Sequence, residues 1–313
     1  MKKTNHTPYF ILNPNSGGGR AAREWKRIEP LLPQFFASTQ IHKTKKSGDA
    51  VLMAKKAALQ GYRQIVSVGG DGTLNEVLNG IMQVPAEIRQ NISLSLFPLG
   101  SGDDFAKTLL WPKDFKQRLQ GILRNQGQKV DVGLIHYQDF KGKKLRRYFL
   151  NICDFGMGGE VVARVNRSSK LFGGKITYLT SILETLMNFK PFSIEASLEG
   201  KKRKFHDITL GIIANGSYFG GGLCVAPQAK LDNGLFEVLL VEKMAALDFL
   251  KLLPQLYLRR ALSVKGIHSF QSSFISVKSL QAPSILLDCD GEQPGILPAS
   301  FELLPQELRV TVL

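Results

Sequence analysis

A strand-to-helix turn built on glycines and one acid occurs at Val68-Gly69-Gly70-Asp71-Gly72-Thr73-Leu74-Asn75-Glu76. The run Ile65–Val68 before it is typical of a buried strand, and the apolar residues after it recur at the spacing of one helix face, at Leu74, Val77, Leu78 and Ile81. Glycine lets a backbone come close to a phosphate, and a helix N-terminus offers it free N–H groups. The turn predicts a phosphate site, although taken alone it also fits a helix that Asp71 merely caps.

Two further turns of the same kind follow two other predicted strands. The turn Gly100-Ser101-Gly102-Asp103-Asp104-Phe105 comes after the strand Leu94–Phe97, and a glycine-rich loop, Asn13–Arg20, comes after the strand Tyr9–Leu12. Predicted helices, one of them over about residues 21–32, alternate with these strands, which indicates a parallel sheet. Because ligands of such sheets bind at the carboxyl ends of the strands, the three loops predict one shared phosphate site.

Two common nucleotide-binding motifs are missing from the sequence. There is no G-x-x-x-x-G-K-[ST], which argues against a P-loop NTPase, and no G-x-G-x-x-G opens the first helix, which disfavours a dinucleotide-binding Rossmann domain. Asp71 stands where a phosphate would bind, and a carboxylate in that place calls for a cation such as Mg²⁺ between the two charges. The loops therefore indicate a phosphate site that also uses a divalent metal.

From about residue 125 onward the pattern changes to short β-rich segments. The predicted strands are 130–136, 148–152, 193–198, 209–214, 235–241, 274–277 and 284–287. Two helical patterns interrupt them, one with Ile176, Leu179, Leu183 and Leu186 on one face and one over about residues 245–258. A chain of 313 residues exceeds one ordinary core. A second, mostly antiparallel β domain is therefore predicted.

The chain carries a formal net charge of +15, to which two basic runs contribute, residues 141–147 and 201–204. Taken singly, each run fits a solvated hairpin turn. Together they favour an anionic partner, and each basic residue near an anionic leaflet adds about 1 kcal/mol. We therefore expect a transient, peripheral contact with an anionic membrane surface. Nucleic acid is not expected as a partner, because no motif for binding it accompanies the charge.

No apolar run approaches the roughly 18 residues that span a bilayer. The apolar stretch after Met1-Lys2-Lys3 is too short for a signal peptide. A cytoplasmic location, with peripheral association at the inner membrane face, is the expectation. The three cysteines, Cys153, Cys224 and Cys289, share no C-x-x-C spacing, so neither a disulfide framework nor a zinc site is predicted.

Another acid-bearing turn occurs at Leu287-Asp288-Cys289-Asp290-Gly291-Glu292. Asp290 and Glu292 are two residues apart, so both side chains can point the same way from an extended backbone. One carboxylate can accept the proton of an attacking hydroxyl while the other orients that hydroxyl or the metal. Taken alone the motif is weak, because turns of this composition are common.

Four motifs, in this order, make the chain similar to the diacylglycerol kinase catalytic family, which is related to sphingosine and ceramide kinases. They are G-G-D-G-T-x-N-E at residues 69–76, G-S-G-x-D-F-A at 100–106, G-G-G-x-x-x-A-P-x-A at 220–229 and D-G-E at 290–292. The Gly-Gly-Asp-Gly-Thr turn is shared with NAD kinases and phosphofructokinases, whereas the last two motifs are more specific to lipid kinases. The matched order runs from Asn13 to Glu292, nearly the whole chain.

The resemblance implies a two-domain fold, α/β plus all-β, with the active site in the cleft between the domains. The first domain would be a Rossmann-like parallel α/β domain of the phosphofructokinase and NAD kinase type, formed by residues 1–127 and about 302–313. A last strand near Leu308 to Leu313 would return to it. The second domain, residues 128–301, would be an antiparallel β-sandwich that binds the lipid substrate.

The functional residues implied by the resemblance fall on the matching motifs. ATP is expected to contact Asn13, Thr44, Gly69, Gly70, Asp71, Gly72, Thr73, Leu74, Asn75, Gly100 and Ser101. Acids that hold the catalytic Mg²⁺ through water correspond to Asp71, Asp104 and Asp131. Glu292, together with Asp290, matches the general base. A structural Mg²⁺ of the family corresponds to a site at Lys230, Asn233 and Leu235.

Two positions depart from the family pattern. Asp103 stands where the family usually has Asn, and an extra negative charge beside a triphosphate weakens ATP binding unless a cation compensates or the side chain points away. Asn233 stands where the structural metal turn has Asp, and the acid is shifted to Asp232. An amide ligand lacks the negative charge that a divalent cation prefers.

The predicted activity is that of an ATP- and Mg²⁺-dependent lipid kinase. Its acceptor would be the primary hydroxyl of diacylglycerol or a similar neutral lipid, and its product a phosphatidate-type lipid. Two alternatives stay open. The Gly69–Thr73 turn also permits a non-lipid kinase of the NAD kinase type, and Asp103 and Asn233 permit a catalytically weak relative that binds nucleotide or lipid and regulates another process. An edge strand of the β domain also permits a homodimer.

Overall fold

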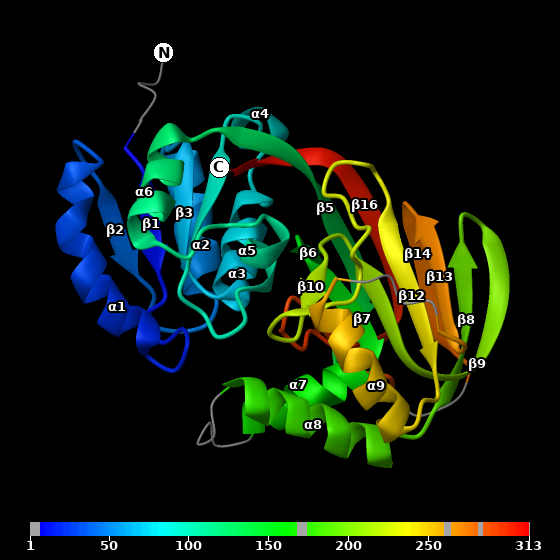
Figure 1. The fold of residues 1–313 in the computed structure, drawn as a ribbon. Coiled ribbons are helices and arrows are strands. Elements are labelled where there is room, and N and C mark those ends of the chain that lie inside the picture. The colour runs from blue at the N-terminus through cyan, green and yellow to red at the C-terminus, as the bar shows by residue number, and fades with distance from the viewer. Residues whose placement is uncertain (1–6, 168–173, 260–263, 281–283, 313) are drawn as a thin grey trace. The chain divides into compact units, whose positions relative to one another are not determined.

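The computed structural model describes residues 7–167, 174–259, 264–280 and 284–312 (Figure 1). They form two compact units, one made of the chain up to Val132 together with the segment from Pro305 onward, the other of Gly133–Leu304. The chain passes from the first unit to the second within β5 (Gly127–Gln138) and returns within β16 (Ile296–Thr311). The domain boundaries expected after residue 127 and near residue 302 stay predictions. Two segments used in the sequence analysis, Met1-Lys2-Lys3 and Leu313, lie outside the described residues.

The first unit is built on a parallel sheet with the strand order β2–β1–β3–β4. These strands are β1 (Tyr9–Leu12), β2 (Gln40–Lys43), β3 (Gln64–Gly69) and β4 (Ser93–Pro98). Residues 309–310 of β16 add to the sheet in parallel beside β4. Strands β1, β3 and β4 are buried along their whole length, as in a parallel sheet that helices cover on both faces. The predicted parallel α/β fold is confirmed.

Helices cover both faces of this sheet (Figure 1). On one face Trp25 and Phe115 both pack against the ring of Phe97, with ring centroids 5.8 and 5.9 Å from it. On the other face α2 and α3 pack together and against the strands. The helical segments are α1 (Arg20–Ile28), the 3-10 helix η1 (Glu29–Gln34), α2 (Asp49–Leu59), α3 (Asp71–Ile81), α4 (Ala86–Arg89), α5 (Asp104–Thr108) and α6 (Phe115–Arg124).

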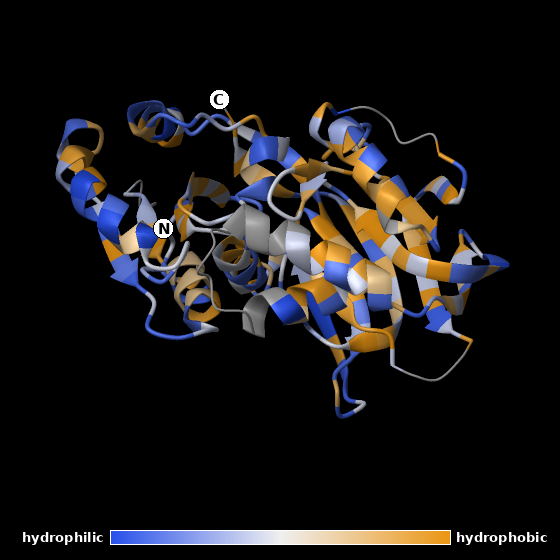
Figure 2. Cartoon of the chain, turned by 60° about the horizontal axis from the view of Figure 1, so that its bottom comes forward, coloured by the Kyte–Doolittle hydropathy of each residue, from blue (hydrophilic) through white to orange (hydrophobic). Residues whose placement is uncertain are grey.

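The second unit is a β-sandwich-like body of mostly antiparallel strands, which confirms the predicted fold of this part of the chain. Its long strand β9 pairs with β8 along its first part and with β12 and β7 along its second part, so it belongs to both layers. Hydrophobic residues concentrate along these strands (Figure 2). Besides β5 and β16, the strands are β6 (Lys144–Phe149), β7 (Ile152–Gly156), β8 (Phe192–Leu198), β9 (Lys201–Ala214), β10 (Tyr218–Phe219), β11 (Leu223–Cys224), β12 (Phe236–Glu242), β13 (Ile267–Ser272), β14 (Phe274–Ser279) and β15 (Leu287–Cys289).

Three helices pack on the sandwich, α7 (Met157–Arg167), α8 (Gly174–Asn188) and α9 (Ala246–Tyr257). Side chains of all three, among them Val161, Ile182 and Leu256, join a second apolar cluster with β9 and β12. Within the described ranges, none of the helices is long and apolar enough to cross a membrane.

Candidate active site

The three glycine-rich loops of the first unit are tied together at one edge of its sheet. Asn13, at the end of β1, donates its Nδ2 hydrogen to Thr73 Oγ1 at 3.0 Å. Ser16 Oγ lies 3.3 Å from the same oxygen and accepts the Gly70 N–H at 3.3 Å. The loop after β1 is thus joined to the turn after β3.

The turns after β3 and β4 touch through their backbones. A Cβ on Gly70 would lie 3.0 Å from Gly100 Cα, and a Cβ on Gly100 would overlap the Gly70 backbone. A Cβ on Gly69 would also lie 2.5 Å from Thr73 Oγ1. These three glycines are needed for close approach, which leaves bare backbone next to the N-terminus of α3. Such an arrangement suits the oxygens of a phosphate.

Asp103 has the compensating cation that its charge requires. Its Oδ1 accepts the Gly100 N–H at 2.8 Å, and its Oδ2 lies 3.8 Å from the guanidinium of Arg20. Burial raises the pKa of Asp103, and the Gly100 N–H and Arg20 oppose that rise. Arg20 also donates to the Gly100 carbonyl, so it links α1 to the turn after β4. Sequence reasoning missed Arg20, although a basic residue directly after a glycine run is a usable signal.

Asp71 faces the start of α5. Its two carboxylate oxygens accept the N–H groups of Asp104 at 3.0 Å and of Phe105 at 3.1 Å. Burial, and then the charges of Asp104 and Asp103, raise the pKa of Asp71 to about 7. Lys107, three residues after Asp104 in α5, donates a hydrogen bond from its Nζ to Asp104 Oδ1 at 2.7 Å. Lys107 was also missed in the sequence analysis.

Asp71 and Asp104 fit a magnesium ion. A Cβ on Gly102 would lie 3.2 Å from Oδ2 of each of these aspartates, so both oxygens border the same space beside this glycine. Carboxylate oxygens are the donors that Mg²⁺ prefers, and it usually keeps several waters. Within the described part of the chain, no group of three His, Cys, Asp or Glu side chains is arranged to ligate a metal directly. Asp131 is buried in β5, where its Oδ1 accepts the Gln306 N–H at 2.8 Å.

The other residues expected to contact ATP take varied positions in the first unit. Thr44 follows β2, is buried, and donates its N–H to the Leu12 carbonyl at 2.9 Å. Gly72 lies in the first turn of α3, Leu74 and Asn75 are buried in the same helix, and Ser101 is exposed. Glu76, at the end of the first motif, accepts the N–H groups of Gly48 at 2.9 Å and Ala50 at 3.2 Å and so caps α2.

In the second unit, Asp290 and Glu292 have different surroundings. The Asp290 carboxylate accepts three backbone N–H groups, those of Leu150 at 3.2 Å, Asn151 at 3.2 Å and Ile152 at 3.0 Å. Glu292 is exposed, and its backbone bridges that of Cys289. Asp290 therefore anchors the turn, while Glu292 is presented at the surface of this unit.

The turn with the expected structural metal site lies before β12. Asn233 Oδ1 accepts the Leu235 N–H at 3.2 Å and closes a turn with Gly234 at φ 74°. Lys230 is exposed in the preceding segment. An amide oxygen already used by the backbone is a poor ligand for a divalent cation. This site stays a prediction.

An apolar cavity lies between the three helices and the sandwich of the second unit. Its lining residues include Met157 and Val161 of α7, Ile182 of α8, Leu210 of β9, and Leu252 and Leu256 of α9. Helix α7 was not predicted from the sequence, because Met157-Gly158-Gly159 is a poor start for a helix.

Comparison with known proteins agrees with this architecture. Residues 7–135 match the diacylglycerol kinase catalytic domain, and residues 151–312 match the YegS C-terminal NAD kinase beta sandwich-like domain. A diacylglycerol kinase of Staphylococcus aureus (strain bovine RF122 / ET3-1) is 30% identical over 306 residues, which are 96% of this chain and 90% of the relative. A diacylglycerol kinase of Bacillus subtilis (strain 168) is 27% identical over 304 residues, 97% and 95% of the two chains.

The fold is also that of a solved structure. A crystal structure of a diacylglycerol kinase from Bacillus anthracis str. Sterne has a TM-score of 0.71 with this chain at 21% identity, and the match covers 98% of this chain and 97% of that one. A parallel α/β unit with joined glycine loops, followed by a β-sandwich unit, is the architecture of a class of kinases. Within that class, the chain belongs to the diacylglycerol kinase family, a family of lipid kinases.

Proposed function

We propose that this protein transfers the γ-phosphoryl group of ATP to the primary hydroxyl of diacylglycerol or a similar neutral lipid. The observation that carries the proposal is the backbone contact between Gly70 and Gly100. It holds two glycine turns and the N-terminus of α3 together without side chains between them. Donors fixed in this way stabilise the charge of a transferring phosphoryl group without reorganising.

The nucleotide would be held by the first unit. The triphosphate would lie along the backbone N–H groups of residues 69–75, with Asn13, Thr44, Gly100 and Ser101 around it. Asp71, Asp104 and Asp131 would hold Mg²⁺ through water, and the ion, when bound, would neutralise phosphate charge. Arg20 keeps Asp103 from repelling the nucleotide, because its guanidinium lies 3.8 Å from that carboxylate.

Glu292 would act as the general base. It accepts the proton of the lipid hydroxyl while the hydroxyl oxygen forms a bond to the γ-phosphorus, and the bond from that phosphorus to the β–γ bridging oxygen breaks to release ADP. Asp290 contributes by holding the turn, because its carboxylate is engaged by three backbone N–H groups. Glu292 belongs to the second unit, and the glycine-rich loops belong to the first.

The lipid chain would enter the apolar cavity of the second unit. Its lining is almost entirely hydrophobic, from Met157 and Val161 to Leu252 and Leu256. Burying one methylene contributes about 0.8 kcal/mol, so a few buried methylenes are enough to favour a lipid over a soluble alcohol. This cavity supports the lipid acceptor over a nucleotide acceptor.

The test is a phosphoryl-transfer assay with labelled ATP, Mg²⁺ and micelles of diacylglycerol, monoacylglycerol, ceramide or sphingosine, with NAD as a soluble acceptor. We expect label in diacylglycerol or a similar neutral lipid. Glu292→Gln should lower kcat by about a hundredfold to ten-thousandfold. Glu302→Gln, an exposed glutamate of the same unit, is the matched control and should retain full activity.

Three other outcomes would count against the proposal. Label in NAD and in no lipid would favour a kinase of the NAD kinase type. Tight ATP binding without transfer to any acceptor would favour a regulatory relative. Equal activity of Glu292→Gln and Glu302→Gln would remove Glu292 from the mechanism.

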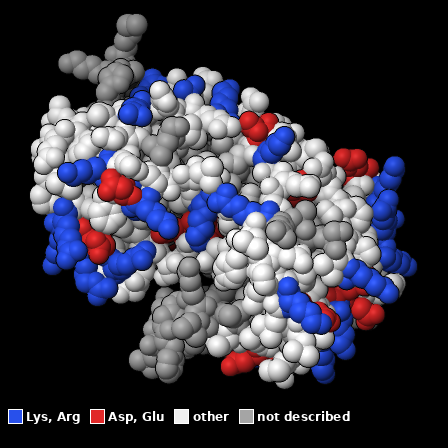
Figure 3. Space-filling model, in the orientation of Figure 1, with Lys and Arg blue, Asp and Glu red and all other residues white. Residues whose placement is uncertain are grey.

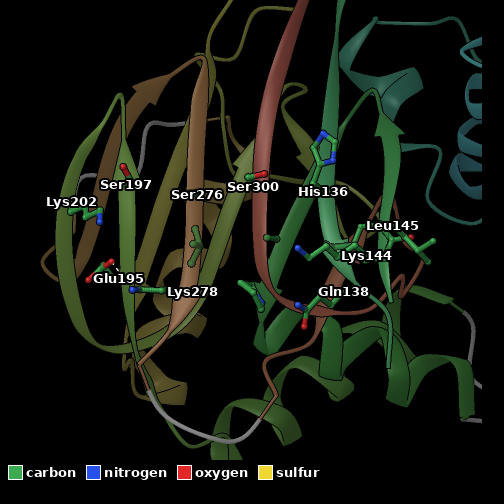
Figure 4. Close-up of a pocket in the computed structure, with 14 residues that line it drawn as sticks. His136, Gln138, Lys144, Leu145, Glu195, Ser197, Lys202, Ser276, Lys278 and Ser300 are labelled. Carbon is green, nitrogen blue, oxygen red and sulfur yellow. Dashed lines mark ion pairs between the residues drawn. The ribbon is translucent and has the colours of Figure 1, made fainter. Parts of the chain in front are cut away.

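We further propose that basic residues of the second unit hold the enzyme at an anionic membrane. Lysines and arginines spread over the face shown in Figure 3, and the exposed run Lys201–Lys204 opens β9. A hollow on the sheet is lined by Lys144, Lys202 and Lys278 together with serine residues (Figure 4). Lys278 is paired with Glu195 at 2.9 Å, which leaves the hollow with an excess of positive charge.

Sedimentation with vesicles tests this contact. Binding should be stronger to vesicles that contain phosphatidylglycerol than to neutral ones, and should weaken as salt is added. Replacing Lys144, Lys202 and Lys278 with glutamine should reduce binding by about a hundredfold at most, at about 1 kcal/mol for each lysine. The same replacement at Lys45 and Lys46 of the first unit is the control. Equal losses in the two variants would show that the hollow has no special role.

A cytoplasmic location and a homodimer stay predictions.

A further inference from the structure

Two buried aspartates face each other just before the Asp290–Glu292 turn. Asp154 of β7 and Asp288 of β15 are directly opposite in the antiparallel pair, and their side chains are hydrogen-bonded to each other. Asp154 is 1% exposed and Asp288 5%. Oδ1 of each carboxyl is buried and has no hydrogen-bond partner.

A hydrogen bond between two carboxyl groups requires a proton. Two carboxylates have no hydrogen to share, and two neighbouring negative charges inside a protein are strongly unfavourable. At least one of these aspartates is therefore protonated in the folded protein. Acids of this kind titrate as a pair rather than one by one.

Among the side chains that the structure describes, the elements packed around the pair bring no compensating cation to it. Helix α7 packs against both strands, and the charged side chains that the structure describes in it are Glu160 and Arg164, of which Arg164 pairs with Glu184 at 3.5 Å. The glycine of α7 nearest the pair is Gly158, where a Cβ would overlap the Asp154 carboxyl. Strand β9 places Ile212 beside Asp154.

The remaining neighbours lie on β7, on β15 and in the turn itself. Asp290 is the acid nearest Asp288 along the chain, and its negative charge disfavours ionisation of Asp288 further. Cys153 and Cys289, on the alternate face of the two strands, lie with their Sγ atoms 2.7 Å apart in the apolar core. No positive group of the described residues is hydrogen-bonded or ion-paired to either aspartate.

The pair lies within the ladder that carries the turn. Strand β15 has only three residues, and Asp288 is its middle one. Two positions later, the Asp290 N–H donates to the Ile152 carbonyl at 2.9 Å, and the Asp290 carboxylate accepts the Ile152 N–H in return. Repulsion between Asp154 and Asp288 would push apart the two strands on which the turn rests.

We propose that Asp154 and Asp288 are a proton-sharing pair that positions the Asp290–Glu292 turn, so that loss of the shared proton at alkaline pH releases the turn. The pair touches neither nucleotide nor lipid in this proposal. It acts through the backbone of β7 and β15. Its effect on catalysis rests on the proposed role of Glu292, whereas its effect on the turn does not.

The sign of the pH effect follows from the burial of the pair. Burial raises the pKa of Asp154 to about 7, and burial with the charges of Asp154 and Asp290 raises the pKa of Asp288 well above its usual range. An unfolded aspartate has a pKa of about 3.9. A raised folded-state pKa means that the stabilisation is fully present below the unfolded value and is lost as pH rises through the folded one. Ionisation of Asp154 near pH 7 still leaves one shared proton, which Asp288 holds more tightly, so the turn should loosen only at a pH above that value.

The first readout needs no activity. The measurement is hydrogen exchange at the backbone amides of Leu150, Asn151 and Ile152, which donate to the Asp290 carboxylate. It is made between about pH 6 and about pH 9, and the rates are corrected for the intrinsic exchange rate at each pH. In the wild type, the protection of these amides from exchange should fall by up to about tenfold per pH unit once the proton shared by Asp154 and Asp288 is lost. In Asp288→Asn it should stay constant, because the amide donates to Asp154 without needing a proton. Asp248→Asn, at an exposed acid of α9, should behave as the wild type.

The second readout is the pH profile of kcat for the same variants. The wild type and Asp248→Asn should lose activity at alkaline pH, and Asp288→Asn should lose much less. Equal pH dependence of exchange in wild type and Asp288→Asn would overturn the proposal. If Asp288→Asn does not fold, Asp154→Asn gives the same test. A melting temperature of the wild type that does not fall as the pH rises would also overturn the proposed pair. Failure of the lipid assay at every pH would instead reject the proposed function and leave the exchange result to decide the pair.

Discussion

Three glycines of the first unit are needed for space rather than for unusual backbone angles. A side chain at Gly100 would run into Gly70, and one at Gly69 into Thr73. None of the three has a positive φ. The sequence indicated that glycines approach a phosphate there, but it did not indicate that two of the turns touch each other. That contact depends on β3 and β4 being neighbours in the sheet.

Gly100→Ala should weaken ATP binding and destabilise the first unit. Forcing an extra methyl into a packed backbone contact typically costs about 1–3 kcal/mol. That cost corresponds to a loss of about fivefold to 150-fold if it falls on nucleotide affinity. Calorimetric titration with ATP and thermal unfolding measure the two effects.

Gly142→Ala is the control for this substitution. Gly142 has φ 79° and nothing within 4 Å of an added Cβ, so it tests backbone strain without a clash. ATP affinity should be unchanged in this variant. If both variants bind ATP as the wild type does, the contact between the turns does not shape the nucleotide site.

Among the elements, those defined by local pattern were predictable. Strands β1, β3 and β4 are uniformly buried and mostly apolar, and they were predicted within a residue at either end. Strand β2 was not predicted, because Gln40-Ile41-His42-Lys43 lacks that pattern and is half-buried or exposed. The helix expected over about residues 21–32 ends as an α-helix at Ile28, since Pro30 and Pro33 convert its second half into η1.

Elements fixed by distant residues could not be predicted. The strand expected over residues 148–152 is in fact two, β6 and β7, and the break falls where Asp290 binds the backbone N–H groups of residues 150–152. The strand expected over 284–287 begins at Leu287 instead, where β15 finds its partner β7. A carboxylate about 140 positions away has no local signature. Arg20 does follow a glycine run, but nothing in the local sequence indicates that it pairs with Asp103, which lies 83 positions later.

Asp290→Ala should therefore destabilise the second unit, while Glu292→Ala should not. Removing the Asp290 carboxylate leaves three N–H groups without their acceptor, and each partly buried donor left unpaired costs about 1–3 kcal/mol. Glu292 is exposed, and replacing an exposed side chain usually changes the free energy of unfolding by no more than about 0.5 kcal/mol. Chemical denaturation should show a lower midpoint for Asp290→Ala alone, although both variants lose kinase activity. Equal midpoints would mean that Asp290 does not anchor the turn.

At the scale of the whole molecule, nucleotide and lipid would be handled by separate units. A change in the cavity of the second unit should then affect the lipid and leave ATP binding intact. Leu252 and Leu247 allow a matched test, because both belong to α9 but Leu252 lines the cavity while Leu247 is 71% exposed.

Leu252→Phe should reduce kcat/KM for long-chain diacylglycerol by about tenfold, since overpacking an apolar site costs about 1–3 kcal/mol. A short-chain analogue should be affected less, and the dissociation constant for ATP should not change. Leu247→Phe should match the wild type in all three measurements. If Leu252→Phe instead lowers activity equally on long and short acceptors, the cavity is ordinary core and the acyl chain binds elsewhere.

The return of β16 to the first unit has a consequence for how the protein is made. Residues 309–310 pair with β4, yet a ribosome reaches them only after it has translated all of residues 133–304. While the second unit is being synthesised, the hydrogen-bonding edge of β4 on that side has no strand to pair with. An open edge of this kind invites pairing with another chain. The nascent first unit should therefore depend on chaperones until its final strand emerges.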